Sequence, residues 1–245
     1  MPDPTPHLRR AAIAAAAAVL VVSSLACSSS KDASPPSTAA VAPGLNSSLP
    51  APSGRALPPN DLVSLQQLYD PVLAPLGMHL TRAALVDRSN GGYEKSDEGT
   101  HLALYVRRTN GTDTPDTYAD GMWTLAALFS PDVFSRWPGL QTYDVCQEIT
   151  DAAPAEGDEP PTASQVQATR EGAAKIDWRT GSLVDVLAAA RSGAGVEYVV
   201  NNAVKESPAF QAAETAALAR LGQTPGSGPA TSAPIPSTTV KRVYG

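Results

Sequence analysis

Large apolar side chains are unevenly distributed along this 245-residue chain, and their distribution limits which part of it can fold. Residues 27–59 and 223–245 are rich in serine, threonine, alanine and proline and contain few large apolar residues. Such segments cannot bury enough surface to offset the conformational entropy that is lost on ordering. We therefore expect a globular domain over residues 60–222, preceded by a disordered tether and followed by a disordered tail.

Charge and cysteine content exclude several classes of function. The formal net charge is -6, whereas a nucleic-acid-binding protein needs a basic surface that displaces counterions from phosphates. The two cysteines are too few for a cysteine-rich zinc site or a framework of disulfides. We therefore expect no nucleic-acid partner.

Residues 1–26 have the three-part design of a secretory signal peptide. Arg9 and Arg10 supply a positive start, residues 11–22 form an uncharged apolar run, and small residues lead up to Cys27. A transmembrane helix needs roughly 18 to 20 apolar residues, and this run is shorter. The pattern predicts export across a membrane.

The end of this signal, Ser24-Leu25-Ala26-Cys27, resembles the lipobox of bacterial lipoproteins. The family usually has leucine three places before the cysteine, whereas here Ser24 occupies that place and Leu25 follows it. The resemblance implies cleavage before Cys27 and attachment of a diacylglyceryl group to its sulfur. Two acyl chains suffice for stable anchoring. Cys27 is therefore the expected lipid attachment site, and the expected location is the extracytoplasmic face of the cell membrane.

The composition is similar to that of uncharacterised envelope lipoproteins of actinobacteria, including mycobacteria. The chain is rich in alanine and has thirteen arginines but only five lysines. This usage is typical of a GC-rich genome. The similarity implies an envelope location and no particular activity.

Hydrophobic spacing predicts alternating helices and strands within residues 60–222. Strands are expected at 78–88, 101–108, 142–148, 164–170, 174–178 and 196–200. Helices are expected after Asn60, after Thr114, from Ser182 and after Ser207, with a break at Ser130-Pro131 in the second. The order predicts an α+β fold, with a mostly antiparallel sheet and helices packed on one face. One domain is favoured, although the acidic stretch 151–161 leaves two halves open.

The two histidines that remain after signal removal lie on predicted strands. His79 and His101 occur without any HExxH, HxxxH or paired-cysteine spacing, so no metal and no cofactor are expected. The two side chains could meet across the hairpin of strands 78–88 and 101–108. A Ser-His-Asp arrangement from dispersed residues stays open, although no GxSxG elbow supports it.

Cys146 is the other cysteine of the chain. Once Cys27 carries lipid, Cys146 has no partner for an intramolecular disulfide. Asp144 and Glu148 are close in sequence and would oppose formation of a reactive thiolate. We therefore interpret Cys146 as a small buried residue of a strand.

Three further patterns have an ordinary structural explanation. Residues 87–98 have the length of a calcium loop, but Gly91 stands where a ligand is needed and strands flank the segment. Acidic residues in 151–159 are typical of a solvated linker. A group of aromatic residues favours core packing, with a cleft for a lipid or a partner protein as the alternative. This group comprises Trp123, Phe129, Phe134 and Trp137.

The sequence as a whole favours an exported, lipid-anchored envelope protein whose domain is a non-enzymatic binding or interaction module. The expected partners are the membrane, through Cys27, and an envelope protein or a lipid. Two alternatives stay open: an envelope hydrolase with dispersed catalytic residues around His79 or His101, and a carrier of a lipid or small ligand. A histidine bonded to a hydroxyl and a carboxylate would favour the hydrolase, and a large apolar cavity would favour the carrier.

Overall fold

The computed structural model describes residues 49–52, 54–88, 94–109, 111, 113–150 and 160–224, and all of these belong to one compact unit. Four features predicted from the sequence lie outside the described residues. These are the signal peptide with Cys27, most of the tether, the acidic stretch 151–159, and the tail from residue 225.

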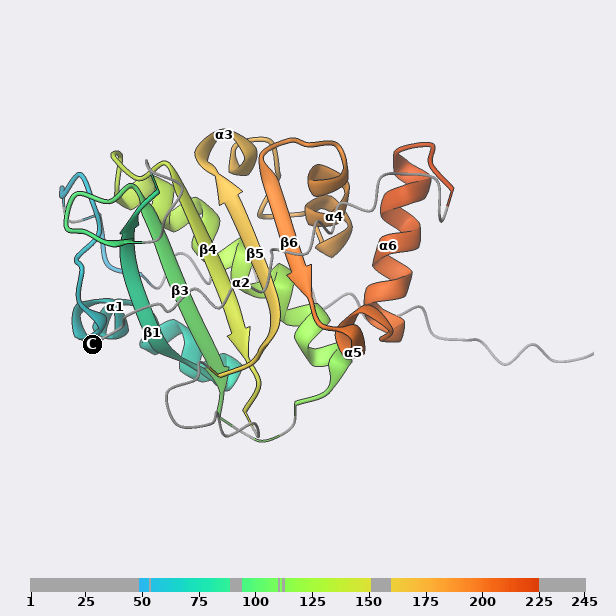
Figure 1. Cartoon of the computed structure of the whole chain (residues 1–245), viewed down its shortest axis with the longest axis horizontal. Coiled ribbons are helices and arrows are strands. Elements are labelled where there is room, and N and C mark those ends of the chain that lie inside the picture. Colours follow the sequence, from blue (N-terminus) through green and yellow to red (C-terminus); the bar gives the residue numbers. More distant parts are fainter. Residues whose placement is uncertain are drawn as a thin grey trace, which may run out of the picture. The chain divides into compact units, whose positions relative to one another are not determined.

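A six-stranded sheet in the order β2-β1-β3-β4-β5-β6 forms the centre of the unit (Figure 1). Its strands are β1 (Met78–Asp87), β2 (Glu94–Lys95), β3 (His101–Arg108), β4 (Thr142–Glu148), β5 (Thr162–Thr169) and β6 (Val196–Val200). All neighbouring strands are antiparallel except β3 and β4, which run parallel. The predicted α+β class with a mostly antiparallel sheet is confirmed.

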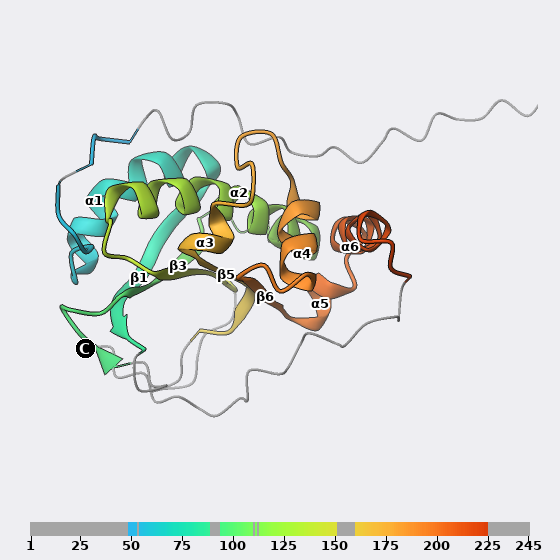
Figure 2. The same ribbon diagram turned by 90° about the horizontal axis from the view of Figure 1, so that it is seen from above.

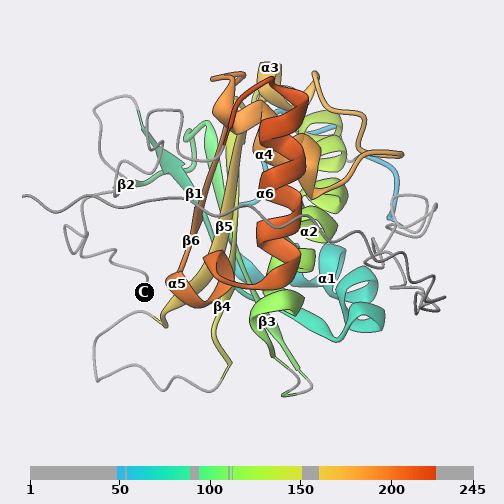
Figure 3. The ribbon, with the colours of Figure 1, turned by 90° about the vertical axis from the view of Figure 1, so that its right-hand side faces the viewer.

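The helices are α1 (Leu62–Leu73), α2 (Pro115–Arg136), α3 (Arg170–Ala173), α4 (Leu183–Arg191), α5 (Asn202–Lys205) and α6 (Pro208–Arg220), and a short 3-10 helix, η2 (Ala74–Leu76), follows α1. Figures 2 and 3 show α1, α2 and α4 on the same side of the sheet. The parallel β3–β4 pair needs a long crossover, and α2 provides it. None of the described helices is long and apolar enough to cross a membrane.

Local sequence signals explain where several helices begin and end. Thr114 caps α2 and forms a capping box with Thr117, in which each side chain bonds the backbone of the other. Ser182 and Asp185 form the same motif at the start of α4. Gly193, with φ of 67°, follows the end of α4 in a left-handed conformation that other residues adopt at a cost.

The core lies between the sheet and the helices. Its aromatic side chains meet edge to face, with Tyr69 and Phe129 ring centroids 4.8 Å apart and Phe134 and Tyr143 centroids 5.7 Å apart. All four aromatic residues that the sequence analysis grouped together are buried: Trp123, Phe129, Phe134 and Trp137. Their interpretation as core residues is therefore confirmed.

Three local predictions are wrong. A break at Ser130-Pro131 was expected, but α2 continues through Pro131 and is 22 residues long in total. It continues because both of its halves bury apolar side chains against the sheet. Such burial outweighs the roughly 3 kcal/mol that an interior proline costs.

The other two wrong predictions concern a strand and a helix cap. Residues 174–178 form turns instead of a strand, and the Trp178 ring stacks on the Trp123 ring with their centroids 5.5 Å apart. The cap of α1 is Asp61, which accepts a 2.7 Å hydrogen bond from the Ser64 N–H, and not Asn60.

The folded unit also begins earlier than the predicted boundary at residue 60. The buried guanidinium of Arg136 donates to the Pro50 carbonyl oxygen at 2.7 Å and to the Ala51 carbonyl oxygen at 3.1 Å. Leu49 and Leu57 pack against the core. The polar contacts are made by backbone carbonyls, and side-chain composition does not reveal these.

Candidate functional site

Strand β4 presents two different chemistries on its two sides. Tyr143 and Val145 point into the helix-covered core. The alternate residues Thr142, Asp144, Cys146 and Glu148, here called the β4 row, point to the opposite face of the sheet. None of the described helices lies on that face (Figure 3). Asp144, Cys146 and Glu148 are nevertheless at most 2% exposed. A buried polar row on a helix-free face is the most unusual feature of the described structure.

His101 forms one end of this polar arrangement. Its Nδ1 lies 2.8 Å from the Thr142 hydroxyl, and its Nε2 lies 3.1 Å from the Asp144 carboxylate. Gln165 on β5 donates to the same carboxylate at 3.0 Å. The side chains of His101 and Asp144 are each 1% exposed. This group therefore ties β3, β4 and β5 together with little access from solvent.

The hydroxyl, imidazole and carboxylate of this group are the components of a nucleophilic triad. Both ring nitrogens of His101 have a partner. In the usual triad the carboxylate orients Nδ1 and the nucleophile meets Nε2, whereas here the two partners are exchanged. His79 does not join this group. It is paired with Arg107 at one end of the β1–β3 pair, and His101 is paired with Val86 at the other end, so the expectation that the two histidines could meet is wrong.

Glu148 forms the other end of the β4 row. Its carboxylate accepts from Arg82 Nε at 2.7 Å, from Arg107 Nη2 at 2.9 Å and from the Thr81 hydroxyl at 2.9 Å. The Arg82 guanidinium also lies 3.9 Å from the centre of the Tyr105 ring. The glutamate side chain is 0% exposed, whereas those of Arg82 and Arg107 are 21% and 31% exposed. This end of the row is therefore positively charged and partly accessible.

Cys146 lies between the two ends of the row. It is a buried cysteine that forms a small apolar cluster with Ala103 and Tyr105. Its sulfur lies 4.0 Å from an oxygen of Asp144. The prediction that Cys146 is buried in a strand is confirmed.

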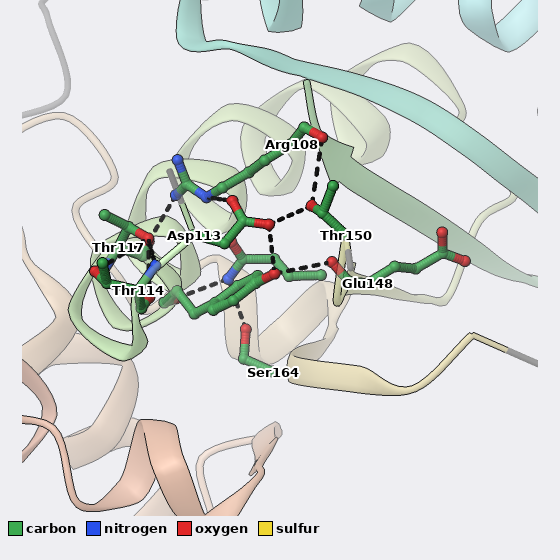
Figure 4. A network of polar contacts seen from close by, with 9 residues as sticks. Arg108, Asp113, Thr114, Thr117, Glu148, Thr150 and Ser164 are labelled. Carbon is green, nitrogen blue, oxygen red and sulfur yellow. Dashed lines mark hydrogen bonds and ion pairs between the residues drawn. The ribbon is translucent and has the colours of Figure 1, made fainter. Parts of the chain in front are cut away.

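A second polar network lies where β3 ends and α2 begins. Figure 4 shows Arg108, Asp113 and Thr150 close together in this network. Arg108 Nη2 donates to the Thr117 carbonyl oxygen at 2.6 Å, and the Thr150 hydroxyl bonds the Asp113 carboxylate. Tyr118 donates to Asp113 at 2.8 Å, and burial raises the pKa of Tyr118 to about 12.

This second network continues into the core through Gln147 on β4. The Gln147 amide donates to the Tyr118 carbonyl oxygen at 2.7 Å and to the Ser164 hydroxyl at 2.6 Å. These bonds fasten the first turn of α2 to β4 and β5. The network supports the ends of three elements, and we assign it a structural role.

The remaining candidates from the sequence give no site. Among the described residues, no group of three or more histidine, cysteine or acidic side chains could hold a metal ion. In the 87–98 segment, β1 ends at Asp87 and β2 occupies Glu94–Lys95. Asp97 accepts a 2.8 Å hydrogen bond from the Asn60 side chain. The acidic residues 151–159 and Cys27 lie outside the described residues.

The chain matches no protein-family model, no curated protein and no solved structure. A function therefore has to be argued from the chain itself.

Sequence reasoning missed Thr142 within the β4 row and the partners that surround the row, namely Thr81, Arg82, Arg107 and Gln165. Polar residues at positions 142, 144 and 148 were the available signal, because such alternation predicts a strand with one polar face. The partners from other strands carry no comparable signal, since pairing register is not visible in a single segment.

Proposed function

We propose that this protein is exported and anchored by lipid on Cys27 to the extracytoplasmic face of the cell membrane, and that its domain is a non-enzymatic binding module. The lipobox-like sequence supports the anchor. The helix-free sheet face with its polar row supports the binding module, and the accessible arginine end of that row is the observation that carries it.

The two ends of the row differ in a way that favours binding over catalysis. A catalytic residue has to touch its substrate, and the side chains of His101 and Asp144 are enclosed at 1% exposure. Arg82 and Arg107 reach solvent. Arginine stays protonated at neutral pH and is therefore suited to hold a ligand more than to exchange protons with it.

The anchor is tested by mass spectrometry of protein purified from its own membrane. We expect the mature chain to begin at Cys27 and to carry the mass of a diacylglyceryl group. Cys27→Ala should leave the membrane fraction or stay unprocessed. Cys146→Ala is the matched control and should keep both the lipid and the membrane location. Unchanged processing and membrane retention in Cys27→Ala would refute the anchor.

An envelope hydrolase is the second candidate, and the contact chain from Thr142 through His101 to Asp144 favours it. The binding proposal expects no turnover of nitrophenyl esters by the purified protein. Hydrolysis that disappears in both Thr142→Ala and His101→Gln, with folding retained, would replace the binding module by the hydrolase.

The carrier alternative receives less support. A carrier needs an apolar cavity of several hundred Å³. The large apolar side chains between sheet and helices pack on one another, with Tyr69 and Trp137 ring centroids 6.5 Å apart. Lipid that co-purifies in stoichiometric amount in the mass spectrum would restore this alternative.

A further inference from the structure

We infer that the arginine end of the β4 row, formed by His79, Arg82 and Arg107, is a binding site for an oxyanion, that is, a phosphate or carboxylate group. The inference names the ligand class of the proposed binding module and rests on that proposal. It depends on charge, on unused hydrogen-bond donors and on access.

Two guanidinium groups meet one carboxylate at this site. Arg82 on β1 and Arg107 on β3 both donate to the single carboxylate of Glu148. These three side chains together carry one net positive charge. Glu148 is fully buried, so the charges interact in surroundings from which much of the water is excluded. An anion that accepts from Arg107 would add a negative charge next to this guanidinium, whose Nε has no hydrogen-bond partner within the described structure.

Two nitrogen atoms at this site are buried and lack a hydrogen-bond partner within the described structure: Arg107 Nε and His79 Nδ1. His79 and Arg107 are cross-strand partners in the β1–β3 register, so their side chains leave the same face of the sheet side by side. A buried donor without an acceptor is unfavourable. An oxyanion that accepts from Arg107 Nε, and from His79 when Nδ1 carries its proton, would satisfy both.

The shape of the donors also fits an oxyanion. A guanidinium presents its N–H groups in a planar fork that matches carboxylate and phosphate oxygens. Arg107 uses only Nη2 toward Glu148, which leaves the Nε side of the fork for a ligand. The exposed fraction of the Arg107 side chain, 31%, gives a ligand a path to it.

The same oxyanion chemistry has two possible sources. One is the phosphate headgroup of an anionic lipid in the membrane to which Cys27 would be anchored. The other is a free phosphate or carboxylate. The test therefore uses the complete mature chain with Cys27→Ser, made without its signal so that no acyl chain holds it to vesicles.

In the first arm, inorganic phosphate and acetate are titrated into this protein, and the Arg Nε–H signals are followed by NMR. We expect saturable binding that shifts the Arg107 signal. Arg107→Gln should weaken binding about ten- to hundredfold, the effect of losing a charge-assisted hydrogen bond. Arg179→Gln removes an exposed arginine elsewhere and should leave binding unchanged.

In the second arm, the same proteins are floated with phosphatidylcholine vesicles that contain or lack phosphatidylglycerol. Phosphatidylglycerol-dependent flotation that Arg107→Gln abolishes would assign the site to a lipid headgroup. Binding of free phosphate or acetate without flotation would assign it to a soluble oxyanion. Either result supports the inference.

Two milder variants keep the test valid if Arg107→Gln does not fold. Arg107→Lys keeps the charge but loses the fork, and His79→Gln removes the neighbouring imidazole; both should weaken binding. Absence of binding in both arms, or binding that none of these variants weakens, overturns the inference. Loss of lipid on Cys27 with oxyanion binding retained would refute the anchor alone, so the two failures are distinguishable.

Discussion

The two faces of the sheet are held together by different interactions, although they are formed by the same strands. On the helix-covered face, β4 contributes Tyr143 and Val145 to an apolar core. On the helix-free face, it contributes Asp144 and Glu148, whose carboxylates contact polar side chains of neighbouring strands. Stability on the first face depends on buried volume, and stability on the second depends on whether each charge keeps its partner.

This difference also separates structural residues from candidate binding residues. Buried volume is conserved by any side chain of similar shape. A buried ion pair contributes little net stability compared with an apolar replacement, but loss of one partner leaves an uncompensated charge. A ligand that supplies or removes charge should therefore change the stability of the helix-free face more than that of the helix-covered face.

The largest loss is expected on the helix-covered face. Phe129 is fully buried against Tyr69, so Phe129→Ala should lower the free energy of unfolding by about 3 to 5 kcal/mol. Urea denaturation measures this loss. Val63, which is 61% exposed, provides the control, because Val63→Ala should change stability by less than about 0.5 kcal/mol. Similar losses in the two variants would contradict the assignment of the core.

The next largest loss is expected on the helix-free face. Glu148→Ala leaves Arg82 and Arg107 without their shared carboxylate, and we expect a loss of about 3 kcal/mol. Glu197 is an exposed glutamate on β6 of the same sheet, and Glu197→Ala should have little effect. A Glu148→Ala loss that increased salt reduces would support charge repulsion as its cause. If Glu148→Ala and Glu197→Ala were equally stable, the Glu148 carboxylate would not be needed to stabilise the two arginines.

A smaller effect is expected at Cys146, between the two ends of the β4 row. Cys146→Ser adds a polar group to a site that is 2% exposed and should cost about 1 to 3 kcal/mol. The Cys146 thiol should react slowly with a thiol reagent in the native state and quickly after denaturation. Fast labelling of folded protein lacking Cys27 would reverse this assignment and would favour a chemical role.

The smallest effect at neutral pH is expected in the polar network on the helix-covered face. Burial raises the pKa of Tyr118 to about 12, above its ordinary value of about 10. The folded state keeps the phenol neutral while the unfolded state ionises, so stability should decrease as the pH rises from about 10 to about 12. Tyr118→Phe should cost about 1 kcal/mol at pH 7 and should flatten this decrease. An unchanged slope would show that other groups cause it.

Local patterns in the sequence predict much of the fold but little of the site. Strands β3, β4 and β6 and helix α4 follow from alternation and from caps that a few adjacent residues define. Continuation of α2 through Pro131 depends on tertiary packing, which no local pattern contains. The short elements β2, α3 and α5 have too few residues to show a period.

The arginine end of the β4 row illustrates why the site escapes prediction. Leu80 and Arg82 are two residues apart, so a regular strand would place both on the same face. The register of β1 shifts between these residues, and Arg82 therefore reaches Glu148 on the face opposite to Leu80. A bulge of this kind is set by strand pairing. The assignment of Cys27 as the lipid attachment site stays a prediction from sequence.

The contacts of Arg136 have a mechanical consequence for a tethered protein. One guanidinium holds the carbonyls of Pro50 and Ala51 and is itself fixed by Asp132, which also accepts from Tyr69. Tension applied along the chain before residue 49 would therefore load two hydrogen bonds in parallel, and both have to break before the segment peels away. The load passes into α2, the longest described helix, before it reaches the sheet. If the proposed anchor on Cys27 pulls on the chain, Arg136 would be the first described side chain to carry the load.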